Sequence, residues 1–306
     1  MNPKYLDLHA SGELRARAQA AVSALEHCEV CPWRCGVDRT RGEQGFCRTG
    51  RQAQVSSASP HFGEEDELVG ERGSGTVFLG RCNLACRHCQ NYDISLSGAG
   101  GREAGPRELA ELMLGLQERG CHNVNFVSPS HVVPQLLEAL CLAVAEGFNL
   151  PLVYNSGGYD ALGTLKLLDG VIDIYLPDMK YADATVAERL SLCRDYPRLN
   201  RLAVKEMHRQ VGGLELEADG VARRGLLIRH LVLPGGLAGT KATASFIAEE
   251  LSPRTRVNLM RQYYPAHHAW QLPPLDRPLS FAEYRQAVAE ARAAGLTNLS
   301  VEGGAG

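Results

Sequence analysis

Three cysteines lie within eight residues directly after a short apolar run, and this arrangement restricts how the middle of the chain can fold. Residues 77–79 have the composition of a buried strand, and Cys82, Cys86 and Cys89 follow in a C-x3-C-x2-C pattern. Three thiolates this close suit one soft metal centre, and in a four-iron cubane they leave one iron without a protein ligand. The pattern predicts a [4Fe-4S] cluster whose open iron binds a small molecule. The alternatives are a zinc site completed by a borrowed ligand, or three packed core cysteines.

The C-x3-C-x2-C loop resembles the signature loop of the radical S-adenosylmethionine (SAM) superfamily. Its lead-in at residues 73–76 and its exit at residues 89–91 are similar to those of the glycyl-radical-enzyme activases. They are most similar to uncharacterised proteins related to pyruvate formate-lyase activating enzyme. The resemblance implies that the open iron chelates the amino and carboxylate groups of SAM. It also implies that an electron from the reduced cluster splits SAM to give a 5′-deoxyadenosyl radical.

A second group of cysteines lies in a turn-rich stretch before this loop: Cys28, Cys31, Cys35 and Cys47. Too few apolar residues surround them for a hydrophobic core, so a metal is the expected source of order in this segment. Their C-x2-C-x3-C-x11-C spacing fits either a closed zinc site, which would be structural, or an auxiliary iron–sulfur cluster, which would relay electrons. Unliganded thiols are the remaining alternative. The segment also resembles the corresponding part of the same uncharacterised proteins.

The composition narrows the class of protein. The 306 residues are long enough for one barrel-sized α/β domain and an appendage, and the net charge of -3 gives no general field for nucleic acid or an anionic membrane. No apolar run reaches transmembrane length, and residues 1–21 lack the apolar centre of a signal peptide. Ten cysteines without a secretion signal favour a reducing compartment. We therefore expect a cytoplasmic protein that binds neither nucleic acid nor a membrane.

Apolar runs and amphipathic segments alternate after residue 91, which is typical of a parallel sheet built from βα units. Six such units predict an α/β fold, a partial TIM-type (β/α)6 barrel, and the radical SAM resemblance implies the same fold. We divide the chain into a small N-terminal cysteine-rich segment, residues 1–70, and the barrel with a C-terminal helical extension, residues 71–306. The expected barrel strands are residues 77–79, 123–127, 151–154, 171–176, 225–233 and 256–260.

The active site of a parallel α/β barrel lies at the carboxyl ends of its strands, so residues that follow the strands are candidates for binding SAM. Asp178 and Lys180 follow the fourth strand and resemble the D-x-K element with which activases hold the methionyl and ribose parts. A loop ion pair without a ligand is the alternative. Ser128 and Ser130 stand where many radical SAM enzymes have a Gly-Gly-Glu element. Hydroxyls or backbone carbonyls are therefore expected to receive the SAM amino group.

The remaining candidates for cofactor binding are His88, Asn91, Asn155 and His230. The residue before the third signature cysteine usually stacks near adenine, and the resemblance gives this place to His88. Asn91 and Asn155 follow the first and third strands. Arg229 and His230 are neighbours in one strand and must face opposite sides of the sheet, and we expect His230 to point into the barrel.

We expect the remaining charged residues and cysteines to have structural rather than functional roles. The acidic run at residues 64–67 is interpreted as a solvated loop, in preference to a site for a metal or a basic peptide. Cys121, Cys141 and Cys193 are isolated and are expected to be packing residues. No Ser/His/Asp arrangement and no phosphate-binding Gly-Lys-Ser loop is evident in the sequence, so hydrolase and ATPase functions have little support.

Together these features predict an oxygen-sensitive radical SAM oxidoreductase that abstracts a hydrogen atom from a protein or small-molecule substrate. The activase resemblance favours a glycine of a partner enzyme, and modification of another peptide or metabolite is the rival within the same chemistry. From another class, the rival is an iron–sulfur or zinc scaffold, or an electron carrier, that binds no SAM. The expected partners are SAM and an electron donor such as flavodoxin or ferredoxin.

Overall fold

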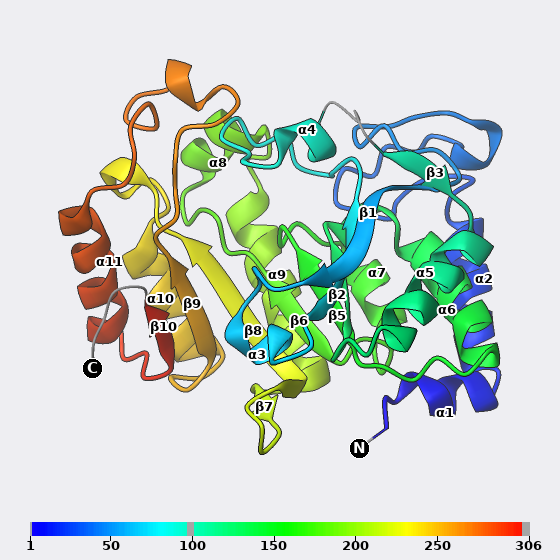
Figure 1. The fold of residues 1–306 in the computed structure, drawn as a ribbon. Coiled ribbons are helices and arrows are strands. Elements are labelled where there is room, and N and C mark those ends of the chain that lie inside the picture. The colour runs from blue at the N-terminus through cyan, green and yellow to red at the C-terminus, as the bar shows by residue number, and fades with distance from the viewer. Residues whose placement is uncertain (1, 97–100, 302–306) are drawn as a thin grey trace.

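The computed structural model of the chain describes residues 2–96 and 101–301, which form an α/β fold around one sheet (Figure 1). The central strands are parallel and neighbour one another in the order β9, β8, β6, β5, β4, β2. The α/β fold with a parallel sheet, predicted from the alternating pattern, is confirmed. These strands are β2 (Ser74–Leu79), β4 (Val124–Val127), β5 (Leu152–Ser156), β6 (Ile174–Pro177), β8 (Ala222–Leu231) and β9 (Arg256–Met260).

The sheet has further strands at both edges, beyond the six predicted barrel strands. Beside β9, the short strand β10 (Leu299–Val301) adds a further parallel strand. At the other edge, β1 (Ala53–His61) runs antiparallel to β2, and β3 (Arg102–Ala104) runs antiparallel to β1. Between the described residues, β3 and β10 do not pair, so the sheet stays open as a partial barrel. A two-residue strand, β7 (Glu215–Leu216), forms a hairpin with β8.

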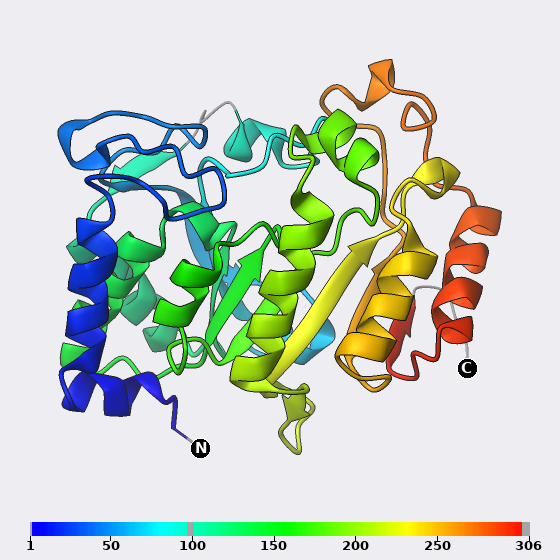
Figure 2. The ribbon, with the colours of Figure 1, turned by 180° about the vertical axis from the view of Figure 1, so that it is seen from behind.

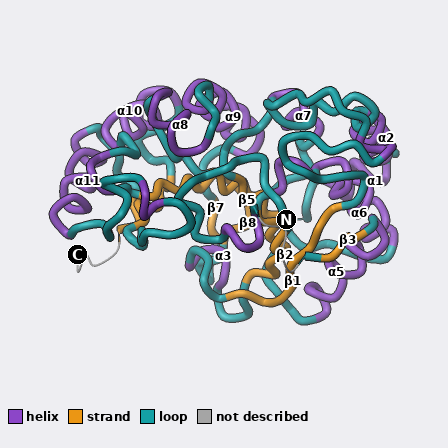
Figure 3. Tube along the Cα trace, turned by 90° about the horizontal axis from the view of Figure 1, so that it is seen from above, coloured by secondary structure: helices purple, strands orange, loops and turns teal. Residues whose placement is uncertain are grey.

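Helices cover the convex face of the sheet, as Figures 2 and 3 show. The first of them, α1 (Tyr5–Ala10) and α2 (Glu13–Ser23), pack against α6, and the last, α11 (Phe281–Ala293), packs against α10. None of the helices in residues 2–96 and 101–301 combines the length and the hydropathy that a membrane span requires. The other helices are α4 (Tyr92–Ser95), α5 (Pro106–Glu118), α6 (Val133–Ala145), α7 (Leu162–Leu167), α8 (Ala184–Ser191), α9 (Tyr196–Val211) and α10 (Thr240–Glu250).

Alternation along the strands decides which side chains reach the concave face of the sheet. Val153 and Leu227 point into this face and form a small core with Leu68 of the short helix α3 (Asp66–Val69). Their neighbours Tyr154 and Ile228 point outwards and pack in the main core beneath the helices. The helix α3 therefore lies against the inner face of the sheet (Figure 3), and the same alternation selects the residues that face the site at the strand ends.

A partly buried carboxyl group just before β6 makes the stability of the fold depend on pH. Asp173 accepts a hydrogen bond from the Leu152 backbone N–H (2.9 Å). Burial nevertheless raises its pKa to about 7, and this hydrogen bond and Arg224 offset the effect only in part. Because the pKa is higher in the folded chain than in the unfolded chain, ionisation of Asp173 opposes folding. The stabilisation that the protonated Asp173 gives the fold is therefore complete below about pH 4, the pKa in the unfolded chain. It is lost as the pH rises through the pKa in the folded chain.

We expect Asp173→Asn to raise the free energy of unfolding at pH 8 by about 2 kcal/mol more than at pH 5. The substitution keeps a hydrogen-bond acceptor for Leu152 and removes the charge. Urea denaturation at the two pH values measures the difference. The exposed Asp276 supplies the control, since Asp276→Asn should give no such pH-dependent gain. A gain that is the same at pH 5 and pH 8 would contradict the assignment.

Candidate functional site

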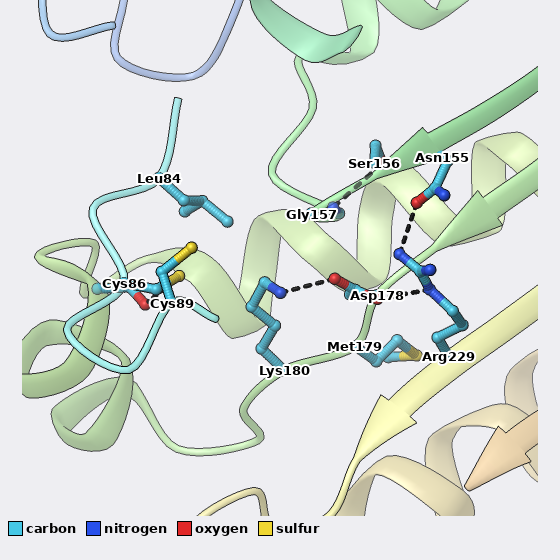
Figure 4. Close-up of polar contacts among 12 residues, drawn as sticks. Leu84, Cys86, Cys89, Asn155, Ser156, Gly157, Asp178, Met179, Lys180 and Arg229 are labelled. Atoms are coloured by element: carbon cyan, nitrogen blue, oxygen red, sulfur yellow. Dashed lines mark hydrogen bonds and ion pairs between the residues drawn. The ribbon is translucent and has the colours of Figure 1, made fainter. Parts of the chain in front are cut away.

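The three signature cysteines come from the loop that follows β2, at the carboxyl end of the sheet, and Figure 4 shows two of them, Cys86 and Cys89. Cys86 is buried, and Cys82 and Cys89 are partly buried. Each sulfur has a polar neighbour of the kind that stabilises a thiolate. The Leu84 backbone N–H donates to Cys82 Sγ (3.4 Å), the Ser191 hydroxyl donates to Cys86 Sγ (3.0 Å), and Cys89 Sγ lies 3.2 Å from Ser95 Oγ.

The donor set of this loop fits an iron–sulfur cluster. Burial raises the pKa of Cys82 to about 12, with Cys86 adding to the effect, and burial also raises the pKa of Cys86. The thiols therefore need a positively charged partner to lose their protons near neutral pH. The soft irons of a cluster are such a partner. Among residues 2–96 and 101–301, no group of three or more His, Cys, Asp or Glu side chains is arranged to hold a single metal ion.

A cavity opens beside these cysteines, between the signature loop and the ends of β6, β8 and β9. Asp178 and Lys180 line it and form an ion pair, with 2.6 Å between Asp178 Oδ2 and Lys180 Nζ (Figure 4). His88 and Asn91 line the same cavity. The structure thus brings four of the predicted cofactor-binding residues together next to Cys86 and Cys89.

Arg229 links this cavity to the inner face of the sheet. Its Nε donates to Asp178 Oδ1 (3.0 Å), and its Nη2 donates to Asn155 Oδ1 (2.5 Å). The predicted residue Asn155 is therefore connected to the cavity through Arg229. Although burial raises the pKa of Asp178, the cations of Arg229 and Lys180 outweigh this effect and hold it below its usual value. Asp178 is thus a carboxylate clamped between two cations.

The expectation that His230 points into the barrel is wrong. Its Nδ1 lies 2.6 Å from the Met179 carbonyl oxygen, and its Nε2 lies 3.0 Å from Thr240 Oγ1 of α10. His230 therefore faces the helices, and both of its ring nitrogens have partners there. Arg229 lies on the opposite side of β8, the inward side that it shares with Leu227. The functional candidate in this strand is Arg229 rather than His230.

The interpretation of residues 64–67 as a solvated loop is also wrong. The side chains of Glu64 and Glu67 are only 9% and 12% exposed. Glu67 pairs with Arg256 of β9 (2.5 Å), and Glu64 Oε2 lies 3.7 Å from Arg229 Nη1. Burial raises the pKa of Glu64, against the opposing influence of Arg229. The acidic run therefore supplies counter-charges to arginines on the inner face of the sheet.

His88 forms an aromatic corner of the cavity. Its ring makes a T-shaped contact with Tyr181 (6.0 Å between centroids) and a tilted contact with Tyr263 (6.3 Å). Burial, together with the nearby Lys180, lowers the pKa of His88 to about 3, so the imidazole is neutral. A neutral ring next to two tyrosines offers a largely apolar surface to a planar base.

The two predicted serines do not line this cavity. Ser128 follows β4 with a left-handed backbone (φ 61°), and its N–H donates to the Asn155 carbonyl (2.8 Å). Ser130 is buried near the Asp160 carboxyl group. The structure therefore places both serines near the strand ends but outside the group formed by Asp178 and Lys180.

The four N-terminal cysteines surround a separate small cavity, at the same end of the sheet as the signature loop (Figure 2). Burial raises the pKa of Cys31, and the other three thiols add to the effect. The spacing of these cysteines in the sequence therefore corresponds to proximity in the fold. The four residues are Cys28, Cys31, Cys35 and Cys47.

No protein-family model matches the chain. The chain is 31% identical over 298 residues to the uncharacterized protein MJ0674 of Methanocaldococcus jannaschii, a match that covers 94% of this chain and 78% of that protein.

Similar solved structures include a radical SAM methyltransferase from Sphaerobacter thermophilus, with a TM-score of 0.48 and 15% identity, covering 80% of this chain and 76% of that one. HydG, a maturase of the [FeFe]-hydrogenase, has a TM-score of 0.48 and 14% identity, covering 73% of this chain and 50% of that one. SuiB of Streptococcus suis, bound to the precursor peptide SuiA, has a TM-score of 0.47 and 13% identity, covering 73% and 47%. These structural likenesses are too distant to carry a conclusion about this chain.

Proposed function

The chain belongs to the same protein family as the uncharacterized protein MJ0674 of Methanocaldococcus jannaschii, and we propose that it is a radical SAM enzyme. The observation that carries this proposal is the Asp178–Lys180 ion pair in the same cavity as Cys86 and Cys89. A loop suited to a cluster and a charged site suited to a zwitterionic ligand thereby share one cavity at the carboxyl ends of the strands. A scaffold or an electron carrier has no need of such a charged cavity.

In this proposal Cys82, Cys86 and Cys89 hold a [4Fe-4S] cluster that keeps one iron open to SAM. When bound and reduced, this cluster supplies the electron that cleaves SAM. The Leu84 N–H and the Ser191 hydroxyl donate hydrogen bonds to the ligand sulfurs and so stabilise their thiolate form.

The polar residues of the cavity bind and orient SAM. Lys180 presents a cation to the carboxylate of the methionyl part, and Asp178 accepts hydrogen bonds from the amino group or the ribose hydroxyls. Arg229 positions Asp178 through the 3.0 Å hydrogen bond between them. The neutral ring of His88, which lines the cavity, would offer a surface for the adenine base. These roles agree with the charges of the residues in the structure, since Asp178 is a carboxylate and His88 is neutral.

We extend the proposal to abstraction of a hydrogen atom from a protein or small-molecule substrate. The resemblance of residues 73–76 and 89–91 to the activases supports a glycine of a partner enzyme as that substrate. A flavodoxin or ferredoxin would deliver the electron. These finer assignments depend on the resemblance rather than on the geometry of the cavity.

Anaerobic reconstitution tests the proposal. We expect the signature loop to take up about four irons per chain, and SAM to yield 5′-deoxyadenosine when dithionite is added. Chromatography measures this product, and the electron paramagnetic resonance spectrum of the reduced protein should change when SAM is added. A protein that holds iron but leaves SAM intact under reductant would be an electron carrier. A protein that holds zinc in place of iron at these cysteines would be a scaffold.

A further inference from the structure

A buried cation lies next to the four N-terminal thiols. Arg39 is 1% exposed, and it lines the same small cavity as these cysteines. Its Nε donates to the Gly50 carbonyl (3.1 Å), and its Nη1 donates to the His131 carbonyl (2.9 Å) and lies 3.7 Å from Cys28 Sγ. Its Nη2 is buried and has no hydrogen-bond partner among the described residues. The partners of this guanidinium are therefore two carbonyl groups and a sulfur.

A buried guanidinium needs an anion nearby, because an unpaired charge in the interior is strongly unfavourable. Neutral thiols do not supply that charge. Four thiolates around a zinc ion or an iron–sulfur cluster do, because together they carry more negative charge than the metal offsets. The Phe46 backbone N–H also donates to Cys35 Sγ (3.4 Å), as expected for a sulfur that acts as a ligand.

The segment that carries these cysteines also contacts the signature loop directly. Trp33 lies between Cys31 and Cys35, and its Nε1 donates to the Asn83 carbonyl (2.7 Å). The Trp33 ring is stacked on Phe46, with 3.7 Å between the centroids. Asn83 directly follows the first signature cysteine. The conformation of the N-terminal loop therefore affects the backbone next to Cys82.

A second contact reaches the other side of the same cysteine. The backbone carbonyl of His131 accepts the hydrogen bond from Arg39. The imidazole Nε2 of His131 lies 3.3 Å from the Gly80 carbonyl oxygen. Gly80 lies two residues before Cys82. The N-terminal loop thus supports the signature loop both before and after Cys82.

We propose that Cys28, Cys31, Cys35 and Cys47 bind a second metal centre, balanced in charge by Arg39, which braces the signature loop through Trp33 and His131. The ligand is a thiophilic metal centre, a zinc ion or an iron–sulfur cluster, held by four thiolates. In the described residues the four sulfurs line one cavity but do not converge on a single point, so a zinc ion would have to draw them together. Arg39 and Trp33 are positioning residues in this arrangement.

The test uses the full chain with Cys82, Cys86 and Cys89 all replaced by alanine, so its outcome does not depend on SAM chemistry. Purified and reconstituted without oxygen, this variant should retain about one zinc or about four irons per chain. Elemental analysis measures the content and distinguishes the two centres. Adding Cys28→Ala and Cys47→Ala should remove the metal, whereas adding Cys121→Ala and Cys141→Ala, at isolated thiols, should not. A triple variant without metal, or one whose metal survives the loss of Cys28 and Cys47, overturns the proposal.

A second measurement leaves the four ligands intact and stands even if the variants at Cys28 and Cys47 fail to fold. The chain has two tryptophans, and Trp270 is 64% exposed, so Trp270→Phe is a mild change that leaves Trp33 as the sole tryptophan, whose emission can be excited apart from that of the tyrosines. In the triple-alanine background, removal of the metal by a chelator should shift the Trp33 emission to longer wavelength, because the indole loses its contacts with Phe46 and Asn83. Restoring the metal should reverse the shift. An emission spectrum that is unchanged after the metal has gone would overturn the bracing role.

Discussion

Replacement of Cys86 by serine is expected to abolish SAM cleavage, with a loss of more than about a hundredfold in rate. Loss of a residue that only hydrogen-bonds to a metal ligand lowers metal affinity or activity about 10–100-fold. Cys86 would itself be a ligand, so its loss should cost more. The buried Cys86 sulfur accepts a hydrogen bond from Ser191, and the pKa of the thiol is raised by burial but lowered in part by Lys180. A hydroxyl at this place is a poor ligand for iron. Formation of 5′-deoxyadenosine under dithionite, together with iron content, measures the effect.

Cys193→Ala is the matched control for this substitution. Cys193 is buried in the same small core as Cys86, but it lies outside the C-x3-C-x2-C pattern. The control protein should keep its iron and its activity. Equal losses in the two variants would mean that packing explains the effect, and an active Cys86→Ser protein would contradict the assignment of the cluster.

The signature loop could be predicted because its chemistry is local. Cys82, Cys86 and Cys89 are close in the sequence, so their proximity follows from the chain itself and needs no knowledge of the sheet. The strands were predictable for a similar reason, since each is a short apolar run between turn-forming residues. Asp178 and Lys180 lie two residues apart, and their meeting in an ion pair of 2.6 Å again depends on local geometry.

The errors concern contacts that depend on tertiary structure. Adjacent residues in a strand face opposite sides, but the sequence does not state which side is inward, so it does not decide between His230 and Arg229. Leu227, two residues earlier on the inward side, packs with Leu68, and only the fold reveals this contact. The pairing of Glu64 with Arg229 joins residues far apart in the chain. An acidic run resembles a solvated loop until its arginine partners are known.

Replacement of Arg229 by glutamine is expected to lower the free energy of unfolding by about 3 kcal/mol at pH 8. The Arg229 side chain is only 18% exposed, and it lies between the carboxylates of Asp178 and Glu64. Without it, Asp178 keeps Lys180, but Glu64 loses this cation while still largely buried. The pKa of Glu64, already raised by burial, would rise further. Its ionisation then opposes folding more strongly as the pH rises, so the loss should be smaller at pH 5 than at pH 8.

A double-mutant cycle with Glu64→Gln separates this charge pairing from general damage to the fold. We expect Glu64→Gln to rescue about 1 kcal/mol of the loss at pH 8, because it removes the carboxylate that Arg229 had balanced. Arg256→Gln is the matched control, since Arg256 is a partly buried arginine that pairs with Glu67. Its effect and that of Glu64→Gln should simply add. Urea denaturation measures all four free energies, and strictly additive effects of Arg229→Gln and Glu64→Gln would show that the two side chains do not interact.

Calorimetry should also find weaker SAM binding in Arg229→Gln, because Asp178 would be held by Lys180 alone. An unchanged affinity would remove Arg229 from the proposed site.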